Sequence, residues 1–568
     1  MILSLSMLTN LKSQFRSTFF TFLCSFVFLL FACNSNHTET SSSSRKTVFR
    51  YNEPGGISSL DPAFARNVEN VWVTNQLFNG LVQMDEKLEV IPCIAYKWEV
   101  SDDGLVYTFH LRNDVYFHDS PVFEGSIGRQ VTAHDFVYSF SRILSEEIAS
   151  PGSWIFNYLD KSSENNYLGF LAKDERTFKV YLKKPFPPFL GILTMQYCTV
   201  VPKEAVDYFG NDFRRNPVGT GPFKFKIWEE GTKLVLVKNN NYFEKDEFGK
   251  ALPYIDAVAV SFVRDQQVSF LDFVRGSYEF MSGLEGNFKD EIFTKEGNLY
   301  PKYEGKFLVQ KHSYLKTDYI GILVDHNNDL VKNSPLKIKA IRQAINYGFD
   351  RKKMVKYLRN SIGIPASSGM IPIGMPAFDD KLIKGYNYNP EKSRELLYVA
   401  GFPDGKGLPP ITLTTTIDYQ NLGEYIQREL LTVGINVNIE VVEEASYREM
   451  VAQSKLTMFK KSWIADYPDS ENFLALFYSK NFSPDGPNYS HFNNYKFDRL
   501  YERAMEENSQ EKRYDYYRQM DKLIIEEAPV IPLYYDEAVR FVQPYVKNLE
   551  VNPMNLLVLK RIKIDEVK

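Results

Sequence analysis

The sequence has little cysteine and histidine, the residues from which most transition-metal sites are built. Its 568 residues include only four cysteines and seven histidines, and neither set shows metal-ligand spacing. The pairs His118-Asp119 and His134-Asp135 fit a turn and a helix cap better than catalytic dyads. We therefore expect no metal site and no catalytic residues.

Signals for nucleotide and nucleic-acid binding are also missing. The segment 401–406 is one residue short of a phosphate-binding loop and lacks Ser or Thr after Lys406, and 219–221 lacks the third glycine of a dinucleotide turn. The formal charge is −4, from 67 basic and 71 acidic residues, with no long basic block, so nucleic acid has no electrostatic footprint. We expect neither a cofactor nor an enzyme; an exported hydrolase is the distant alternative.

The N-terminus indicates export. Lys12 and Arg16 precede an apolar run over 18–31, which has the length of a signal-peptide core and is short for a membrane span. Ala32-Cys33 resembles a bacterial lipoprotein cleavage site, which predicts a signal peptide over 1–32 and a lipid on Cys33. The polar, serine-rich residues 33–45 suit a tether. An ordinary signal peptide with an incidental cysteine is the alternative.

Two cysteines, Cys93 and Cys198, remain in the mature chain. Export permits a disulfide between them, but the sequence sets no distance between the two thiols. Two separate buried thiols are the other expectation.

From residue 46 onward, strand and helix patterns alternate, which predicts an α/β fold. Pro after a capping residue marks two helix starts, and Gly434 ends another helix. The predicted elements are a hairpin over 223–238, a buried strand over 190–201, helices opened by Ser334-Pro335 and Asn389-Pro390, and a helix and strand over 424–442.

The stretch 460–473 places an indole, a carboxylate and a proline turn side by side between two segments that are expected in the core. Asp466 precedes Tyr467-Pro468, which is a common turn signal. Its carboxylate is either a turn former or a charge that faces a ligand. The residues alone leave both readings open.

Several blocks of the mature chain, in order, resemble the extracellular solute-binding protein family 5, which contains the oligopeptide- and dipeptide-binding proteins of ABC importers. Each block is short, but together they span nearly the whole mature chain. They are Leu77-Phe78-Asn79-Gly80-Leu81, Ala95-Tyr96-Lys97-Trp98-Glu99, residues 111–119, Thr132-Ala133-His134-Asp135-Phe136, residues 216–223, residues 338–346, residues 430–435, residues 463–473 and residues 528–535.

The resemblance implies an α/β, bilobal periplasmic-binding-protein fold of the type II, large peptide-binding class. Lobe one is expected to combine residues 46–80, 215–305 and 530–568, with an additional domain over 81–214. Lobe two is expected over 306–529. A ligand is expected between the lobes and is enclosed when they close.

The same resemblance implies roles for five residues. In the peptide-binding members, the position of Asp466 pairs with the α-ammonium of the peptide and that of Trp463 lines the cleft. Lys460 occupies the position that serves the peptide's carboxyl end in oligopeptide binders. Tyr534 and Tyr535 are candidates for side-chain pockets, with a core position as the equal alternative.

The expected ligands are short peptides, and the expected partner is an ABC permease in the cytoplasmic membrane. The protein is expected to be a monomer, exported and lipid-anchored, on the periplasmic side of the inner membrane or the outer face of a single membrane. Other members of the family take up nickel chelates, haem, opines or sugars, and some act as sensors; these ligands and this role are the alternatives.

Overall fold

The computed structural model describes residues 46–162, 167–283 and 288–566. The predicted signal peptide over 1–32, the predicted lipidation site Cys33 and the tether over 33–45 lie outside the described residues. No described helix combines the length and the apolar character that a membrane crossing requires.

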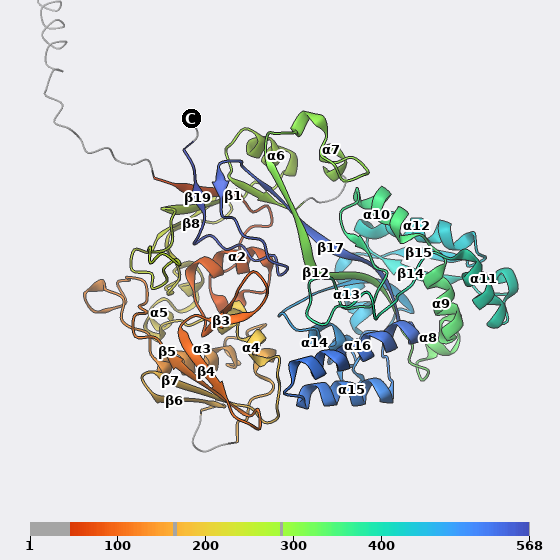
Figure 1. Ribbon diagram of the computed structural model, residues 1–568, viewed down its shortest axis with the longest axis horizontal. Coiled ribbons are helices and arrows are strands. Elements are labelled where there is room, and N and C mark those ends of the chain that lie inside the picture. Colours follow the sequence, from red (N-terminus) through yellow and green to blue (C-terminus); the bar gives the residue numbers. More distant parts are fainter. Residues whose placement is uncertain (1–45, 163–166, 284–287, 567–568) are drawn as a thin grey trace, which may run out of the picture. The chain divides into compact units, whose positions relative to one another are not determined.

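Within the described residues, a mixed sheet of 11 strands forms the framework (Figure 1). Its order is β15-β14-β16-β12-β17-β11-β1-β10-β9-β8, with β13 paired to β17. The strands are β1 (Val48–Asn52), β8 (Phe223–Glu229), β9 (Lys233–Lys238), β10 (Ala257–Ser261), β11 (Phe280–Ser282), β12 (Leu308–Ile322), β13 (Ile364–Pro365), β14 (Ile411–Thr415), β15 (Val437–Val441), β16 (Met458–Ile464) and β17 (Val530–Val542).

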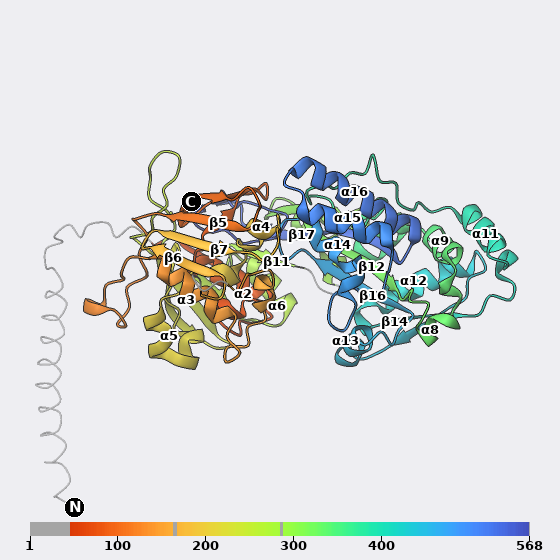
Figure 2. The ribbon, with the colours of Figure 1, turned by 90° about the horizontal axis from the view of Figure 1, so that it is seen from below.

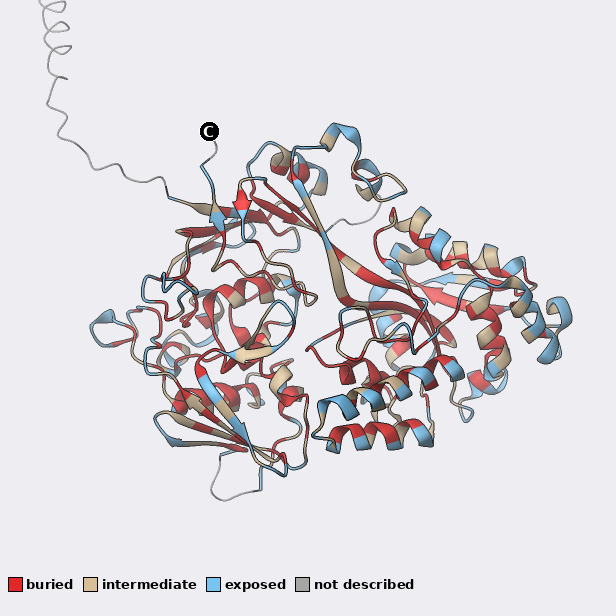
Figure 3. Cartoon of the chain, viewed as in Figure 1, coloured by how far each residue is buried: buried red, intermediate tan, exposed pale blue. Residues whose placement is uncertain are grey.

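Two long antiparallel strands, β12 and β17, join the two halves of this sheet. We call the half with β1 and β8–β11, together with the part of the chain between β1 and β8, lobe one, and the half with β14–β16 lobe two. The pairing runs from Leu308 opposite Val542 to Gly321 opposite Val530, and its register shifts between Ser313 and Thr317. Figure 3 shows that burial increases along β12 toward lobe two. The register shift between Ser313 and Thr317 lies where β12 begins to pair with β16 of lobe two, and a second shift follows between Asp318 and Tyr319.

Helices cover the strands of lobe two because their apolar residues recur at helical spacing. Ile341, Ile345, Ile426 and Leu430 are fully buried against Leu413 of β14. The helices of this lobe are α8 (Asp329–Lys332), α9 (Lys339–Tyr347), α10 (Arg351–Arg359), α11 (Pro390–Val399), α12 (Gln420–Leu431), α13 (Glu444–Ala452), α14 (Glu471–Leu474), α15 (Tyr495–Glu506) and α16 (Gln510–Glu527).

A separate antiparallel sheet, in the order β4-β5-β7-β6, lies within the predicted additional domain (Figure 2). Its strands are β4 (Ala95–Val100), β5 (Val106–Leu111), β6 (Phe170–Asp174) and β7 (Thr177–Tyr181). Helix α3 (Ala133–Ile143) packs Phe136 and Phe140 against Phe170 and Phe178 of this sheet. The domain boundaries inferred from the resemblance stay predictions.

The remaining elements are short and belong mostly to the part of the chain before β12. They are α2 (Val68–Leu77), β2 (Val82–Met84), β3 (Val90–Pro92), α4 (Phe189–Ile192), α5 (Lys203–Phe209), α6 (Gln266–Val274), α7 (Lys289–Ile292), β18 (Val546–Lys547) and β19 (Lys563–Ile564).

Several local predictions are confirmed. Strands β8 and β9 form the expected antiparallel hairpin, and the Asn389 side chain caps α11 by accepting from the Lys392 amide. Thr132 and Asp135 form a capping box on α3, which agrees with the capping role expected for the His134-Asp135 pair. Cys93 and Cys198 are free and buried, so the second of the two expectations for these thiols is correct.

The buried strand predicted over 190–201 is wrong. The segment forms the helical turn α4 and a 3-10 turn over Gln196–Cys198. Its apolar side chains are buried as expected, but a short apolar run does not distinguish a buried strand from buried helical turns. The prolines Pro187 and Pro188 directly before α4 favour a helix start over a central strand.

Buried charges connect the three central strands. Asp318 of β12 accepts from the Lys460 ammonium of β16 at 2.5 Å and lies 3.2 Å from the ammonium of Lys316. Lys316 also contacts Asp536 of β17, which in turn pairs with Arg359 at 2.5 Å. Burial alone would raise the pKa of Asp318, but Lys460, Lys316 and Arg359 together lower it. The Asp318 carboxylate is therefore ionised and binds two ammonium groups, that of the buried Lys460 and that of the half-buried Lys316.

We expect Asp318→Asn to lower the free energy of unfolding by about 3–5 kcal/mol, because it leaves the buried Lys460 ammonium without its anion. Urea unfolding measures this change. The matched control is Asp329→Asn, which removes an exposed carboxylate paired with Lys332 at 2.8 Å and should leave the stability close to that of the wild type. Equal, small effects of the two substitutions would contradict the role of Asp318.

Candidate ligand-binding site

Asp466 is the second residue after the end of β16, in the connection to α14. The Ala465 amide donates to the Leu315 carbonyl at 2.8 Å, which ties the start of this connection to β12. Among the described residues, no Lys, Arg or His forms an ion pair with Asp466. Its side chain is open to solvent, yet the protein around it desolvates the carboxylate and raises its pKa. The carboxylate is thus accessible to solvent and has no cationic partner in the described part of the chain.

Asn472 orients both of the predicted ligand contacts. Its Oδ1 accepts from the Trp463 indole Nε1 at 2.8 Å and from the Asp466 amide at 3.2 Å, and its Nδ2 donates to Asp466 Oδ2 at 3.3 Å. Asn472 is buried, so it holds the indole and the carboxylate in one arrangement. The sequence reasoning missed this residue; its amide side chain, six positions after Asp466 in the same block, was the available signal.

The turn itself is formed by Asp469, not by Asp466. Asp469 Oδ1 accepts from the amide of Glu471, two residues later, at 2.9 Å, which is the Asx-turn pattern. The two readings of the stretch therefore belong to two different carboxylates. Asp466 takes no part in the turn and stays available to a partner.

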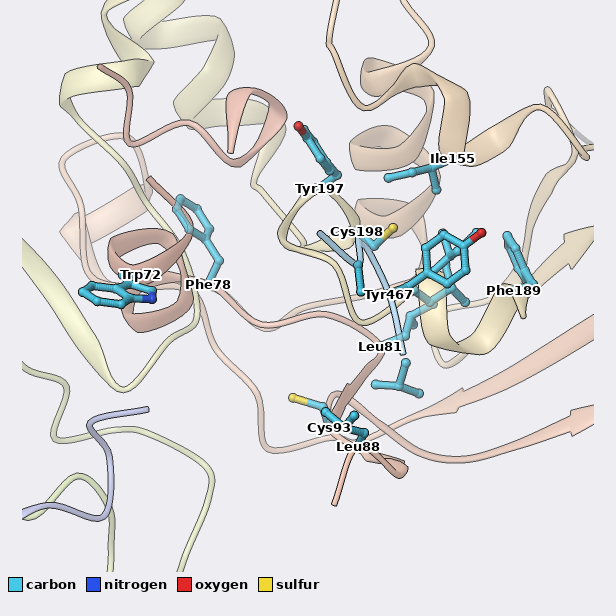
Figure 4. Close-up of a cluster of buried hydrophobic side chains, with 14 of the residues drawn as sticks. Trp72, Phe78, Leu81, Leu88, Cys93, Ile155, Phe189, Tyr197, Cys198 and Tyr467 are labelled. Carbon is cyan, nitrogen blue, oxygen red and sulfur yellow. The ribbon is translucent and has the colours of Figure 1, made fainter. Parts of the chain in front are cut away.

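Tyr467 and Pro468 attach this stretch to lobe one. The Tyr467 ring is buried, with its centroid 6.2 Å from that of Trp154, and Figure 4 shows it among buried side chains that include Phe189 and Cys198. Pro468 lies against Gly191. Asp466 is therefore held where the two lobes meet.

Tyr197, from the same segment as Gly191, is close enough to Asp466 for the two to interact electrostatically. Burial raises the pKa of Tyr197 to about 12, and the negative charge of Asp466 adds to this effect. Tyr197 is itself buried, and Figure 4 shows it in the same region as Tyr467. Lobe one thus contributes a phenol beside the carboxylate of lobe two.

Two further carboxyl groups of the same stretch, those of Glu471 and Asp469, are buried. Glu471 accepts hydrogen bonds from the hydroxyls of Tyr467 and Tyr501, and burial raises its pKa to about 7. Burial also raises the pKa of Asp469, which lies 4.0 Å from Arg513. Both groups have partners within the protein, in contrast to Asp466.

The other predicted site residues are engaged by the protein itself. Lys460 is buried in its pair with Asp318, and burial outweighs this attraction and lowers its pKa. The Tyr534 hydroxyl accepts from Arg359 Nη1 at 3.0 Å, and the Tyr535 hydroxyl donates to the Gly369 carbonyl at 2.8 Å. Both tyrosines are buried, which agrees with the core position that the sequence left open. Their roles toward a ligand stay predictions.

Two lobes joined by a pair of shared strands, with an accessible and unpaired carboxylate where they meet, define a class of two-lobed binding proteins. The chain belongs to the bacterial extracellular solute-binding proteins, family 5, whose model for the middle region matches residues 89–485. The family resemblance seen in the sequence is thereby confirmed.

Relatives of known function cover most of the chain. Heme-binding protein A of Haemophilus influenzae is 26% identical over 543 residues, which are 93% of this chain and 94% of the relative. The dipeptide-binding protein of Escherichia coli is 26% identical over 505 residues, which are 86% of this chain and 89% of the relative.

Solved structures confirm the bilobal α/β fold. The periplasmic binding protein DppA of Helicobacter pylori, in complex with the peptide STSA, is 26% identical, with a TM-score of 0.72 over 92% of this chain and 99% of that chain. The unliganded open form of the murein tripeptide-binding protein MppA has a TM-score of 0.74 at 24% identity, over 92% of this chain and 98% of that chain.

The raised pKa of Glu471 predicts a pH-dependent stability. The folded protein holds this proton between pH 4.5 and about 7, whereas the unfolded chain loses it, so the contribution of Glu471 falls as the pH rises through this window. In the wild type, Glu471 should therefore lower the free energy of unfolding by roughly 3 kcal/mol across this pH window, and Glu471→Gln should abolish this decrease.

Urea unfolding at several pH values compares the wild type with Glu471→Gln. Burial raises the pKa of Asp521 to about 7 as well, but Asp521 is present in both proteins, so the difference between them isolates Glu471. The exposed control Glu511→Gln should keep the wild-type profile. Parallel profiles of the wild type and Glu471→Gln would contradict the assignment.

Proposed function

We propose that this protein captures short peptides between its two lobes and delivers them to the permease of an ABC importer in the cytoplasmic membrane. The observation that carries the proposal is the Asp466 carboxylate, which is accessible, partly desolvated and without a cationic partner among the described residues. An α-ammonium that is buried by lobe closure needs such a charge.

A peptide of unspecified sequence is recognised through the groups that all peptides share. In our proposal Asp466 binds the α-ammonium, Trp463 lines the cleft, and backbone groups pair in the manner of strands without regard to side chains. A role of Lys460 at the carboxyl end requires its ammonium to leave Asp318. Tyr534 and Tyr535 are weaker candidates, since both face the core.

The relatives support this ligand class. Several are named as dipeptide-, oligopeptide- or murein peptide-binding proteins, and the structural neighbour at 26% identity holds a peptide. The protein is proposed to act as a monomer without cofactor or catalytic activity, exported and anchored by a lipid on Cys33. Absence of peptide hydrolysis by the purified protein checks the exclusion of an exported hydrolase.

Haem is the second candidate ligand, because heme-binding protein A is 26% identical over 93% of the chain. Mass spectrometry of the ligand that co-purifies with the soluble mature domain distinguishes the two. Mixed short peptides are the expected result. Recovery of haem, a metal chelate or a sugar in place of peptides would overturn the proposal.

Asp466→Ala should leave the fold intact and weaken the binding of a short peptide by roughly 2–5 kcal/mol, because the buried ammonium loses its partner. Isothermal titration measures this with the free and the N-acetylated form of one peptide. The exposed control Asp485→Ala, also in lobe two, should bind like the wild type. Equal affinities of the wild type for the two peptide forms would remove Asp466 from this role.

A further inference from the structure

A pocket of about 400 Å³ is lined by residues from both lobes. Arg66, Asn67 and Pro151 line it from the part of the chain before β12, and Arg448 of α13 lines it from lobe two. The pocket lies near Tyr197: Pro151 lines the pocket, and the next residue, Gly152, packs against the Tyr197 ring.

This pocket is close to Asp466. The pKa of Tyr197, raised mainly by burial, is raised further by Asp466 and lowered by Arg66. One phenol therefore interacts with both the carboxylate of lobe two and the guanidinium of lobe one. The two charges of opposite sign lie near the same side chain of lobe one.

Both arginines of the pocket have guanidinium nitrogens that donate no hydrogen bond to the described residues. Arg66 is exposed, and no hydrogen bond or ion pair joins its guanidinium group to another described residue. Arg448 is exposed and uses its Nε to bind Glu444 at 2.7 Å, which leaves both of its terminal nitrogens without a partner among the described residues. Lys461 adds positive charge nearby: burial lowers its pKa, and Arg448 lowers it further.

We propose that Arg66 and Arg448 form an anion site that is completed when the lobes close, and that this site takes the free carboxylate of the ligand. Two guanidinium groups that approach from opposite lobes repel each other, and an anion between them makes charge-assisted hydrogen bonds to both. With Asp466 at the ammonium, the site selects ligands that carry both charges. This inference rests on the proposed capture of peptides.

The test compares trialanine with its C-terminal amide by isothermal titration. The wild type should bind the free acid at least tenfold more tightly, and the variant Arg66→Gln/Arg448→Gln should bind both forms equally. The matched control Arg264→Gln/Arg428→Gln removes one exposed arginine from each lobe outside the pocket and should keep the wild-type preference. Equal affinities in the wild type, or an unchanged preference in the pocket variant, would overturn the inference and leave peptide capture standing.

A second arm separates the anion site from the proposed function. If the wild type binds neither form of trialanine, capture of this peptide fails, and inorganic phosphate then tests the site alone. Phosphate should raise the thermal unfolding midpoint of the wild type and of the control more than that of the pocket variant. Equal shifts in all three proteins would show that the two arginines bind no anion and would overturn the inference.

Discussion

The antiparallel pairing of β12 with β17 is the constraint on which the rest of the structure depends. These strands run through both halves of the large sheet. The buried pair of Asp318 and Lys460 joins β12 to β16, and the pair of Lys316 and Asp536 joins β12 to β17. An uncompensated charge in this position is costly, so the three strands hold one another in register. The connection after β16 starts from this framework, which places Asp466 at the meeting point of the lobes.

The carboxyl groups of this region differ in the hydrogen-bond and ion-pair partners that the protein provides for them. Asp318 has ammonium partners, Glu471 has two tyrosine hydroxyls, and Asp469 closes a turn near Arg513. Among the described residues, only the side-chain amide of Asn472 donates a hydrogen bond to the Asp466 carboxylate. An accessible carboxylate that its neighbours orient but do not neutralise suits a cationic ligand group, because the ligand supplies the missing charge.

The fold alone does not choose the ligand. Relatives at the same 26% identity are named for haem and for dipeptides, so the shared scaffold carries different sites. We propose that the charges between the lobes distinguish the ligands. In our proposal these are the carboxylate of Asp466 and the guanidinium groups of Arg66 and Arg448, which together would favour ligands with both an ammonium and a carboxylate.

The sequence by itself determined the family, through its ordered motifs, and the local features, such as the β8–β9 hairpin and the Asn389 cap. These local features depend on interactions between residues that are close in sequence, so the sequence is enough to predict them. Only the tertiary structure decided which side chains contact each other. It paired Lys460 with Asp318 and placed Asn472 between Trp463 and Asp466. These outcomes depend on contacts between residues far apart in sequence or on the folded path of a loop, and pattern and spacing do not encode them.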